Sequence, residues 1–264
     1  MADWNENRSS REGLGRTGFG ASPGLSGGVA RTGEVFDAGL RRHMLSIYNY
    51  MASGVLLTGL VAMLTATSGF VYTIMSGPLA WIVMLSPLAI VLAMSFGRNK
   101  FSTTTLQGMF WGFAVLMGLS LSTIFLVYTG ASIAATFFAT AGAFAGLSLY
   151  GYTTQRDLSG FGTFLIMGVV GLLIASLLNM WLQSETLMWA VSFLGVLIFA
   201  GLTAYDTQRL KSEYVAVQQM KMTNPGVAAA YPVGKMVVMG ALSLYLDFIN
   251  MFLFLLRFMG ATRD

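Results

Sequence analysis

The sequence contains no cysteine and only one histidine, His43. The absence of cysteine excludes disulfides, a thiolate nucleophile and iron–sulfur ligation. With one histidine and no thiolate, the chain also lacks the ligands of a structural zinc site. His43 follows Arg41 and Arg42 and no nucleophile motif is apparent, so serine hydrolysis is not indicated. No other motif points to a bound cofactor.

Charged residues are also scarce. They make up 10% of the 264 residues, whereas soluble globular domains carry about 25%. Hydrophobic residues make up 55%, and the mean hydropathy is +0.69. This composition predicts an integral membrane protein whose surroundings are the lipid bilayer. The net charge of +4 is therefore not taken as a sign of nucleic-acid binding. In a membrane protein, the informative property of the Lys and Arg residues is the side of the membrane on which they lie.

Residues 1–40 differ from the rest of the chain. They are rich in Gly, Ser and Arg, and their few large apolar residues show no period. Such a segment cannot bury enough apolar surface to fold, so we predict a disordered tail. No apolar region with a small-residue cleavage site follows its charges, which argues against a secretory signal. The remaining residues, 41–264, form the predicted membrane domain.

Long apolar segments define that domain. A helix needs about 20 apolar residues to cross the bilayer core, and seven segments meet this requirement. The sequence therefore predicts an all-α fold of seven transmembrane helices. The expected spans are residues 46–67, 79–96, 106–128, 133–150, 161–180, 187–205 and 234–259. The connection 206–235 is long and contains Asn224-Pro225-Gly226 as a breaker.

Two glycine pairs have the spacing of close helix contacts, Gly108 with Gly112 and Gly142 with Gly146. Such pairs let two membrane helices approach closely. We expect them to pack within the monomer or in a dimer.

The basic residues are distributed unequally. With the N-terminus inside, thirteen of the fifteen Lys and Arg residues fall in inner segments, and only Arg257 and Arg263 fall outside. Without the six that precede the first predicted span, the ratio is still seven to two. The positive-inside rule therefore predicts a cytoplasmic N-terminus, and seven spans place the C-terminus outside.

Asp247 lies in the middle of the last apolar segment, 241–257. A carboxylate in hydrocarbon is costly unless it is paired, hydrated or protonated. Such residues usually face the interior of a helix bundle or a water-filled cavity. Asp247 is therefore the first candidate for a functional residue.

Asp206 is the second candidate, at the predicted end of the sixth span. If the seventh helix begins late or is broken near its start, Asp206 and Asp247 come within reach of each other. Two carboxylates in a low-dielectric site cannot comfortably both ionise, so the pair can share a proton and form a pH-responsive latch. Alternatively, Asp206 pairs with Arg209 one turn away, and Asp247 is a neutral or hydrogen-bonded buried acid.

Four further residues are candidates for a network around the acids. Arg98, at the inner end of the second span, is either a counter-ion or an ordinary positive-inside residue. Tyr205, Tyr245 and Asn250 lie close to the acids in sequence. They either complete a polar network or are simply amphipathic side chains.

Several segments carry a resemblance to a known family. The sequence resembles the Bax inhibitor-1 family (the TMBIM or lifeguard group), in its bacterial branch, over roughly residues 35–260. The matching segments are residues 117–122, 149–159, 204–208 and 244–257. The last two are the most specific, and they contain Asp206 and Asp247.

The resemblance implies a central seventh helix wrapped by two groups of three helices. It also implies that an aspartate pair, here Asp206 and Asp247, gates a pH-dependent calcium leak. In the family an arginine of the second helix engages this pair, and Arg98 is the nearest equivalent. A bacterial member is expected in the inner (plasma) membrane.

The sequence suggests three candidate functions. The first is a pH-sensitive leak for Ca²⁺ or H⁺, in which carboxylate oxygens bind a hard cation transiently and no permanent metal site exists. The alternative is a non-transporting modulator of a membrane-bound ATP-dependent protease, or a regulator of stress or cell death. The third is an intramembrane aspartyl protease. Residues 244–246 lack the Gly-x-Gly that such enzymes place before the second aspartate, so we expect no enzyme activity.

Overall fold

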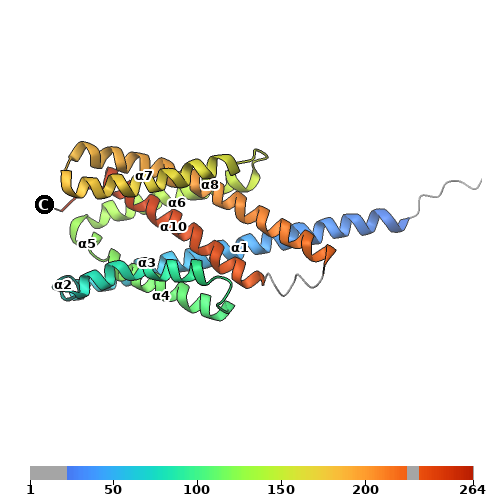
Figure 1. Ribbon diagram of the computed structural model, residues 1–264, viewed down its shortest axis with the longest axis horizontal. Helices are drawn as coiled ribbons and strands as arrows, with labels where there is room; N and C mark the ends of the chain where they lie inside the picture. The colour runs from blue at the N-terminus through green and yellow to red at the C-terminus, as the bar shows by residue number, and fades with distance from the viewer. Residues whose placement is uncertain (1–22, 225–231, 264) are drawn as a thin grey trace, which may run out of the picture. The chain divides into compact units, whose positions relative to one another are not determined.

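The computed structural model describes residues 23–224 and 232–263, with side chains described from Asp37 onward. Every regular element in these residues is a helix, and the β-type pairing among them is one isolated antiparallel bridge between Tyr128 and Thr262. The helices (Figure 1) are α1 (Pro23–Thr67), α2 (Phe70–Met75), α3 (Leu79–Gly97), α4 (Thr103–Leu121), α5 (Ile124–Val127), α6 (Gly130–Thr153), α7 (Ser159–Leu182), α8 (Glu185–Thr223) and α10 (Val233–Met259).

Seven helical stretches of the described chain are long and apolar enough to cross a membrane. The all-α fold class and the seven predicted spans are therefore confirmed. Most boundaries move outward by a few residues. The first span begins at Asp37, and the third joins α4 and α5 into one stretch, Thr103–Val127.

The chain divides into two compact units, residues 1–39 and 40–264. Residues 1–22 lie outside the described residues, so the disorder predicted there stays a prediction. From Pro23 the backbone is helical, where the sequence predicted a tail to residue 40. Proline suits the first helical position, whose N–H has no partner within the helix. A helix already nucleated in the apolar span also extends upstream one residue at a time at low cost.

Helix α8 extends well beyond its predicted end. The sequence placed its end near Tyr205 and a long loop after it, but α8 continues to Thr223. This part of the helix contains no Gly or Pro, and it includes three Gln, two Lys and two Met, which favour helix. The breakers Pro225 and Gly226 come only after it. Asp206 therefore lies in a helix interior, and the predicted position at a helix end is wrong.

Helix α10, which carries Asp247, is the most buried of the seven. In its most apolar window 61% of the residues are buried, against 17–39% in the other spans. It packs against α4, α6 and α8, and Figure 1 shows it running obliquely beside them. The arrangement of the other six helices as two groups of three stays a prediction.

Tyr245 fixes α10 against α1 and α4. Its fully buried hydroxyl lies 2.7 Å from Thr58 Oγ1, and Thr58 donates to the Ala114 carbonyl oxygen. Its ring meets Phe113 edge to face, at 5.0 Å between centroids. A buried tyrosine generally finds such a hydrogen-bond partner.

The predicted glycine pairs are not the close contacts of this fold. A Cβ added at any of the four glycines, Gly108, Gly112, Gly142 and Gly146, would meet nothing within 4 Å. The close approach occurs at Gly151 instead, where a Cβ would collide with the backbone of Ala204. Helices α6 and α8 therefore touch two residues before Asp206. Spacing alone could not show which helix faces turn inward. The four glycines make no close contact within the monomer, and the alternative of a dimer contact stays a prediction.

Candidate functional site

Helices α8 and α10 bring the two predicted aspartates into one site. Asp206 and Asp247 lie in the helix interiors, with 7% and 5% of their surfaces exposed. Asp206 is close enough to act electrostatically on the Asp247 carboxyl, as does Arg209. No break in α10 is needed for this, because Asp206 sits on a continuous α8 that runs alongside α10.

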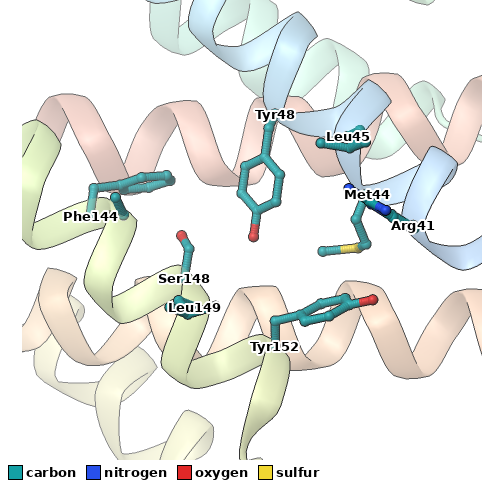
Figure 2. Close-up of a pocket in the computed structure, with 9 residues that line it drawn as sticks. Arg41, Met44, Leu45, Tyr48, Phe144, Ser148, Leu149 and Tyr152 are labelled. Carbon is teal, nitrogen blue, oxygen red and sulfur yellow. The ribbon is translucent and has the colours of Figure 1, made fainter.

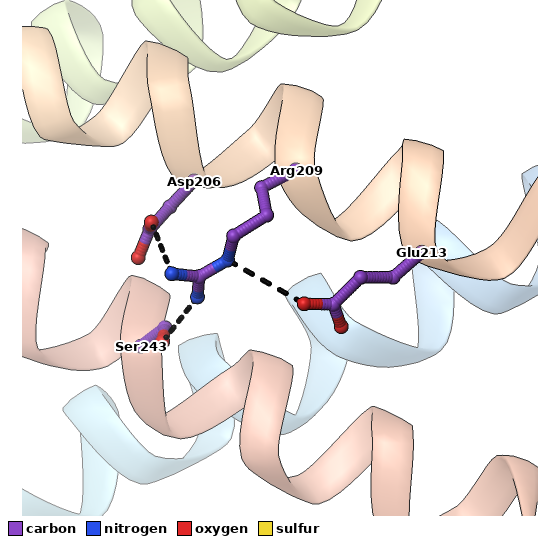
Figure 3. Close-up of polar contacts among 4 residues, drawn as sticks. All are labelled: Asp206, Arg209, Glu213 and Ser243. Carbon is purple, nitrogen blue, oxygen red and sulfur yellow. Dashed lines mark hydrogen bonds and ion pairs between the residues drawn. The ribbon is translucent and has the colours of Figure 1, made fainter. Parts of the chain in front are cut away.

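Arg209 connects the groups of this site (Figure 3). Its Nη1 lies 3.2 Å from Asp206 Oδ1, one turn earlier in α8. Its Nη2 donates to Ser243 Oγ on α10 at 3.1 Å. Its Nε lies 3.7 Å from Glu213 Oε1, too far for a hydrogen bond but close enough for an ion pair. The alternative in which Asp206 pairs with Arg209 is what the structure shows, and it coexists with the proximity of the two acids.

One guanidinium stands among three carboxyl groups. Arg209 forms ion pairs with Asp206 and Glu213 and acts electrostatically on the Asp247 carboxyl. Among the described residues, Asp247 Oδ2 is buried without a hydrogen-bond partner, and so is Oγ1 of Thr207, the residue after Asp206 in α8. Buried polar atoms without a partner are rare, and they often mark a group that works by changing its partner or its proton.

A polar cavity of about 260 Å³ adjoins the acids. Its lining includes the ends of α3 and α10 and the middle of α8, and it comprises Ser95, Arg98, Arg209, Leu210, Glu213, Met236, Met239, Gly240 and Ser243. Arg209 lines this cavity and also contacts Asp206. The guanidinium thus lies between the cavity and the aspartate pair.

Arg98 lies on the cavity wall rather than on the aspartates. Its carbonyl oxygen accepts a 3.5 Å hydrogen bond from Lys235 Nζ, which ties the end of α3 to the start of α10. Within the described residues the ion pairs involve Arg209, and none involves Arg98. In this conformation the counter-ion of the acids is therefore the arginine of α8.

The other candidate residues take different places. The ring of Tyr205 lies 5.8 Å from the guanidinium carbon of Arg209, a cation–π contact at the edge of the site. Tyr245 belongs to the core contact with Thr58, and Asn250 donates to the Leu246 carbonyl of its own helix at 2.8 Å. The hydrogen bonds that the structure shows for these two side chains therefore go to groups other than the acids.

Three residues with contacts at or near this site were not predicted from the sequence. Ser243 and Glu213 stand four residues from Asp247 and Arg209, and this one-turn spacing was a usable signal. The Gln208 side chain spans α8 and the loop before α7, accepting from Leu158 N at 2.9 Å and donating to the Arg156 carbonyl at 2.7 Å. That contact joins residues about fifty positions apart, and no local pattern indicates it.

Within residues 37–224 and 232–263, whose side chains the structure describes, no three His, Asp or Glu side chains gather where one ion could bind them. The two aspartates offer carboxylate oxygens, which suit a hard cation in passage.

Comparisons with known proteins cover the whole membrane unit. The family model described as "Inhibitor of apoptosis-promoting Bax1" matches residues 40–264. Protein RP147 of Rickettsia prowazekii is 46% identical over 233 residues, 88% of this chain and 94% of that protein. The inner membrane protein YbhL of Escherichia coli K12 is 46% identical over 228 residues, 86% of this chain and 94% of YbhL.

A more distant relative shows the same coverage. The membrane protein SpyM3_0260 of Streptococcus pyogenes is 31% identical over 227 residues, 85% of this chain and 94% of that protein. The family match over residues 40–264 thus extends through all seven candidate spans. The chain is an integral membrane protein and belongs to the Bax inhibitor-1 family.

Proposed function

We propose that the protein is a pH-sensitive calcium leak channel of the bacterial inner membrane, gated by Asp206 and Asp247. The observation that carries the proposal is that two buried carboxyl groups on adjacent membrane helices share one guanidinium, that of Arg209. Ionisable groups at this depth commonly belong to ion or proton pathways. The E. coli relative is an inner membrane protein, which supports the location.

Charge balance provides the pH response. With one proton shared by the two acids, Arg209 compensates the remaining negative charge and the helices α8 and α10 stay together. Loss of that proton leaves two carboxylates facing each other beside one cation. Their repulsion loosens the contact between α8 and α10, which is the opening step.

Calcium is the cargo of this pathway. Carboxylate oxygens are the ligands that Ca²⁺ prefers, and an ion passing the site needs only weak, transient binding. Arg209 lines the polar cavity of about 260 Å³. Movement of this side chain off Asp206 would join the cavity to the acid pair.

We further propose that the N-terminus is cytoplasmic and the C-terminus outside, on the distribution of Lys and Arg. This orientation directs the polar cavity toward the cytoplasm, because Arg98 and Lys235 lie beside it at the ends of their helices. We also propose that the protein carries out no covalent chemistry. Leu244-Tyr245-Leu246 stands where an intramembrane aspartyl protease has Gly-x-Gly.

Calcium flux into proteoliposomes, measured with an enclosed indicator from acidic to alkaline pH, tests the proposal. Flux is expected to rise with pH in the wild type. The rise should disappear in Asp206→Asn and in Asp247→Asn, since neither variant retains a pair that can share a proton. Asp157→Asn is the matched control, because this acid lies in a loop between two spans.

Two outcomes contradict the proposal. Unchanged flux and unchanged pH dependence in both aspartate variants would remove the role of the pair. A wild-type protein that passes no calcium at any pH would favour the alternative, a non-transporting modulator of a membrane-bound protease. In that case protease substrates should turn over at different rates in cells with and without this protein.

A further inference from the structure

A second cavity, of about 430 Å³, lies between α1 and α6. It shares no lining residue with the polar cavity beside Asp206. One end is basic, at Arg41, and the apolar part of the lining includes Leu45, Phe144 and Leu149. Figure 2 shows the hydroxyls of Tyr48 and Ser148 directed into the space between the two helices. The volume falls in the range of small-molecule sites, roughly 300–1,000 Å³.

Ser148 is the unusual residue of this cavity. A serine or threonine in an apolar helix normally donates to a carbonyl of its own preceding turn. Thr140 and Thr153 of the same helix do so, at 2.8 and 2.7 Å. The Ser148 hydroxyl is buried and has no hydrogen-bond partner among the described residues. It is a free donor aimed into the cavity, and a bound group with an acceptor oxygen would satisfy it.

The polar groups are layered along the membrane normal. Arg41 lies near the start of the span Asp37–Thr67, and Tyr152 near the end of the span Gly130–Thr153. Because both line the same cavity, its basic end lies at a membrane surface. Ser148 is one turn deeper than Tyr152, and Phe144 is two turns deeper, about 12 Å at 1.5 Å per residue.

The cavity opens toward lipid. Leu45 and Leu149 on its wall are 50% and 64% exposed, and on a membrane helix such apolar surface faces the bilayer. A second cation stands at the basic end, since Lys211 Nζ donates to the Tyr152 carbonyl at 2.8 Å and lies 5.1 Å from its ring centre. Basic side chains at this level attract anionic headgroups.

We propose that this cavity binds one anionic phospholipid. The phosphate lies at Arg41, where a guanidinium can form two parallel hydrogen bonds to it. An ester carbonyl of the glycerol backbone, which only accepts hydrogen bonds, lies against the Ser148 and Tyr48 hydroxyls. One acyl chain continues along Phe144. The order of cation, hydroxyl and apolar wall matches the order of phosphate, ester and chain in the lipid.

Native mass spectrometry of the full-length protein, titrated with phosphatidylglycerol and with phosphatidylcholine, tests the assignment. The wild type should bind phosphatidylglycerol at least fivefold more tightly. Arg41→Gln should bring the two affinities within twofold of each other. Arg42→Gln removes the neighbouring charge that does not line the cavity, so it should keep the wild-type preference.

Ser148→Ala separates the ester contact from the phosphate contact. Loss of one hydrogen bond should weaken both lipids by about fivefold without changing the preference between them. The proposal is overturned if the wild type shows no headgroup preference, or if Arg42→Gln loses as much as Arg41→Gln. It is also overturned if soluble glycerol phosphate alone displaces the lipid, because the site would then be a simple anion site.

Discussion

The guanidinium of Arg209 lies 3.2 Å from the carboxylate of Asp206, one turn earlier on the same helix. The same guanidinium donates to Ser243 on α10, the helix that carries Asp247. One side chain thus links the two helices at the level of the acid pair. Any movement of Arg209 changes the charge that both aspartates experience.

Arg209→Gln tests whether this arginine closes the proposed leak. The variant leaves two buried acids without their cation, so calcium flux should rise several-fold and its pH dependence should shift. Arg98→Gln is the matched control, because Arg98 lines the same cavity and forms no ion pair with any acid whose side chain the structure describes. Its flux should stay within twofold of wild type. A larger effect of Arg98→Gln than of Arg209→Gln would identify the arginine of the second span as the latch instead.

Asp247→Asn should stabilise the protein. The substitution keeps the shape of the side chain and removes a buried carboxyl whose Oδ2 has no hydrogen-bond partner among the described residues. Replacing buried ionic groups by neutral ones of similar volume is often neutral or stabilising. The Tm in detergent should rise by a few degrees. Asp206→Asn should lower the Tm, since Arg209 loses its ion pair, and a loss of equal size in both variants contradicts the prediction.

Gly151→Ala tests the close contact of α6 with α8. The new methyl group would collide with the backbone of Ala204, which cannot move aside as a side chain can. We expect a loss of about 1–3 kcal/mol in the free energy of unfolding. Gly146→Ala on the same helix meets nothing within 4 Å and should be neutral or stabilising by about 0.5–1 kcal/mol. Similar values for both variants in detergent-unfolding titrations would show that these helices do not approach closely.

Tyr245→Phe tests the anchor of α10. The loss of the hydrogen bond to Thr58 should cost about 1 kcal/mol. Thr58→Val also removes the bond to the Ala114 carbonyl, so a double-mutant cycle is needed to isolate the pair. The coupling energy should be about 1 kcal/mol, and the pH dependence of calcium flux should be unchanged in Tyr245→Phe. A coupling near zero, or a shifted pH profile, would place Tyr245 in the acid network after all.

Hydropathy predicted the spans well because crossing a bilayer requires a fixed length of apolar helix. It failed at the end of α8, where the helix leaves the apolar segment and continues through residues 206–223 with charged and amide side chains. Apolar length reports where the membrane ends, whereas the helix ends only where breakers such as Pro225 stop it. That difference moved Asp206 from a helix end to a helix interior.

The sequence by itself determined that this is a membrane protein with seven apolar helices and a costly acid in the last one. It also identified Asp206 and Asp247 through the family resemblance. Only the tertiary structure decided which contacts the candidate residues make. Asp206 pairs with Arg209 rather than with Arg98, and Arg209 also bonds to Ser243. The Tyr245 hydroxyl meets Thr58 rather than an acid. The physical reason is that a helix can rotate about its axis and turn any face toward its neighbour. Hydropathy is nearly uniform around a membrane helix, so it does not specify which face points inward.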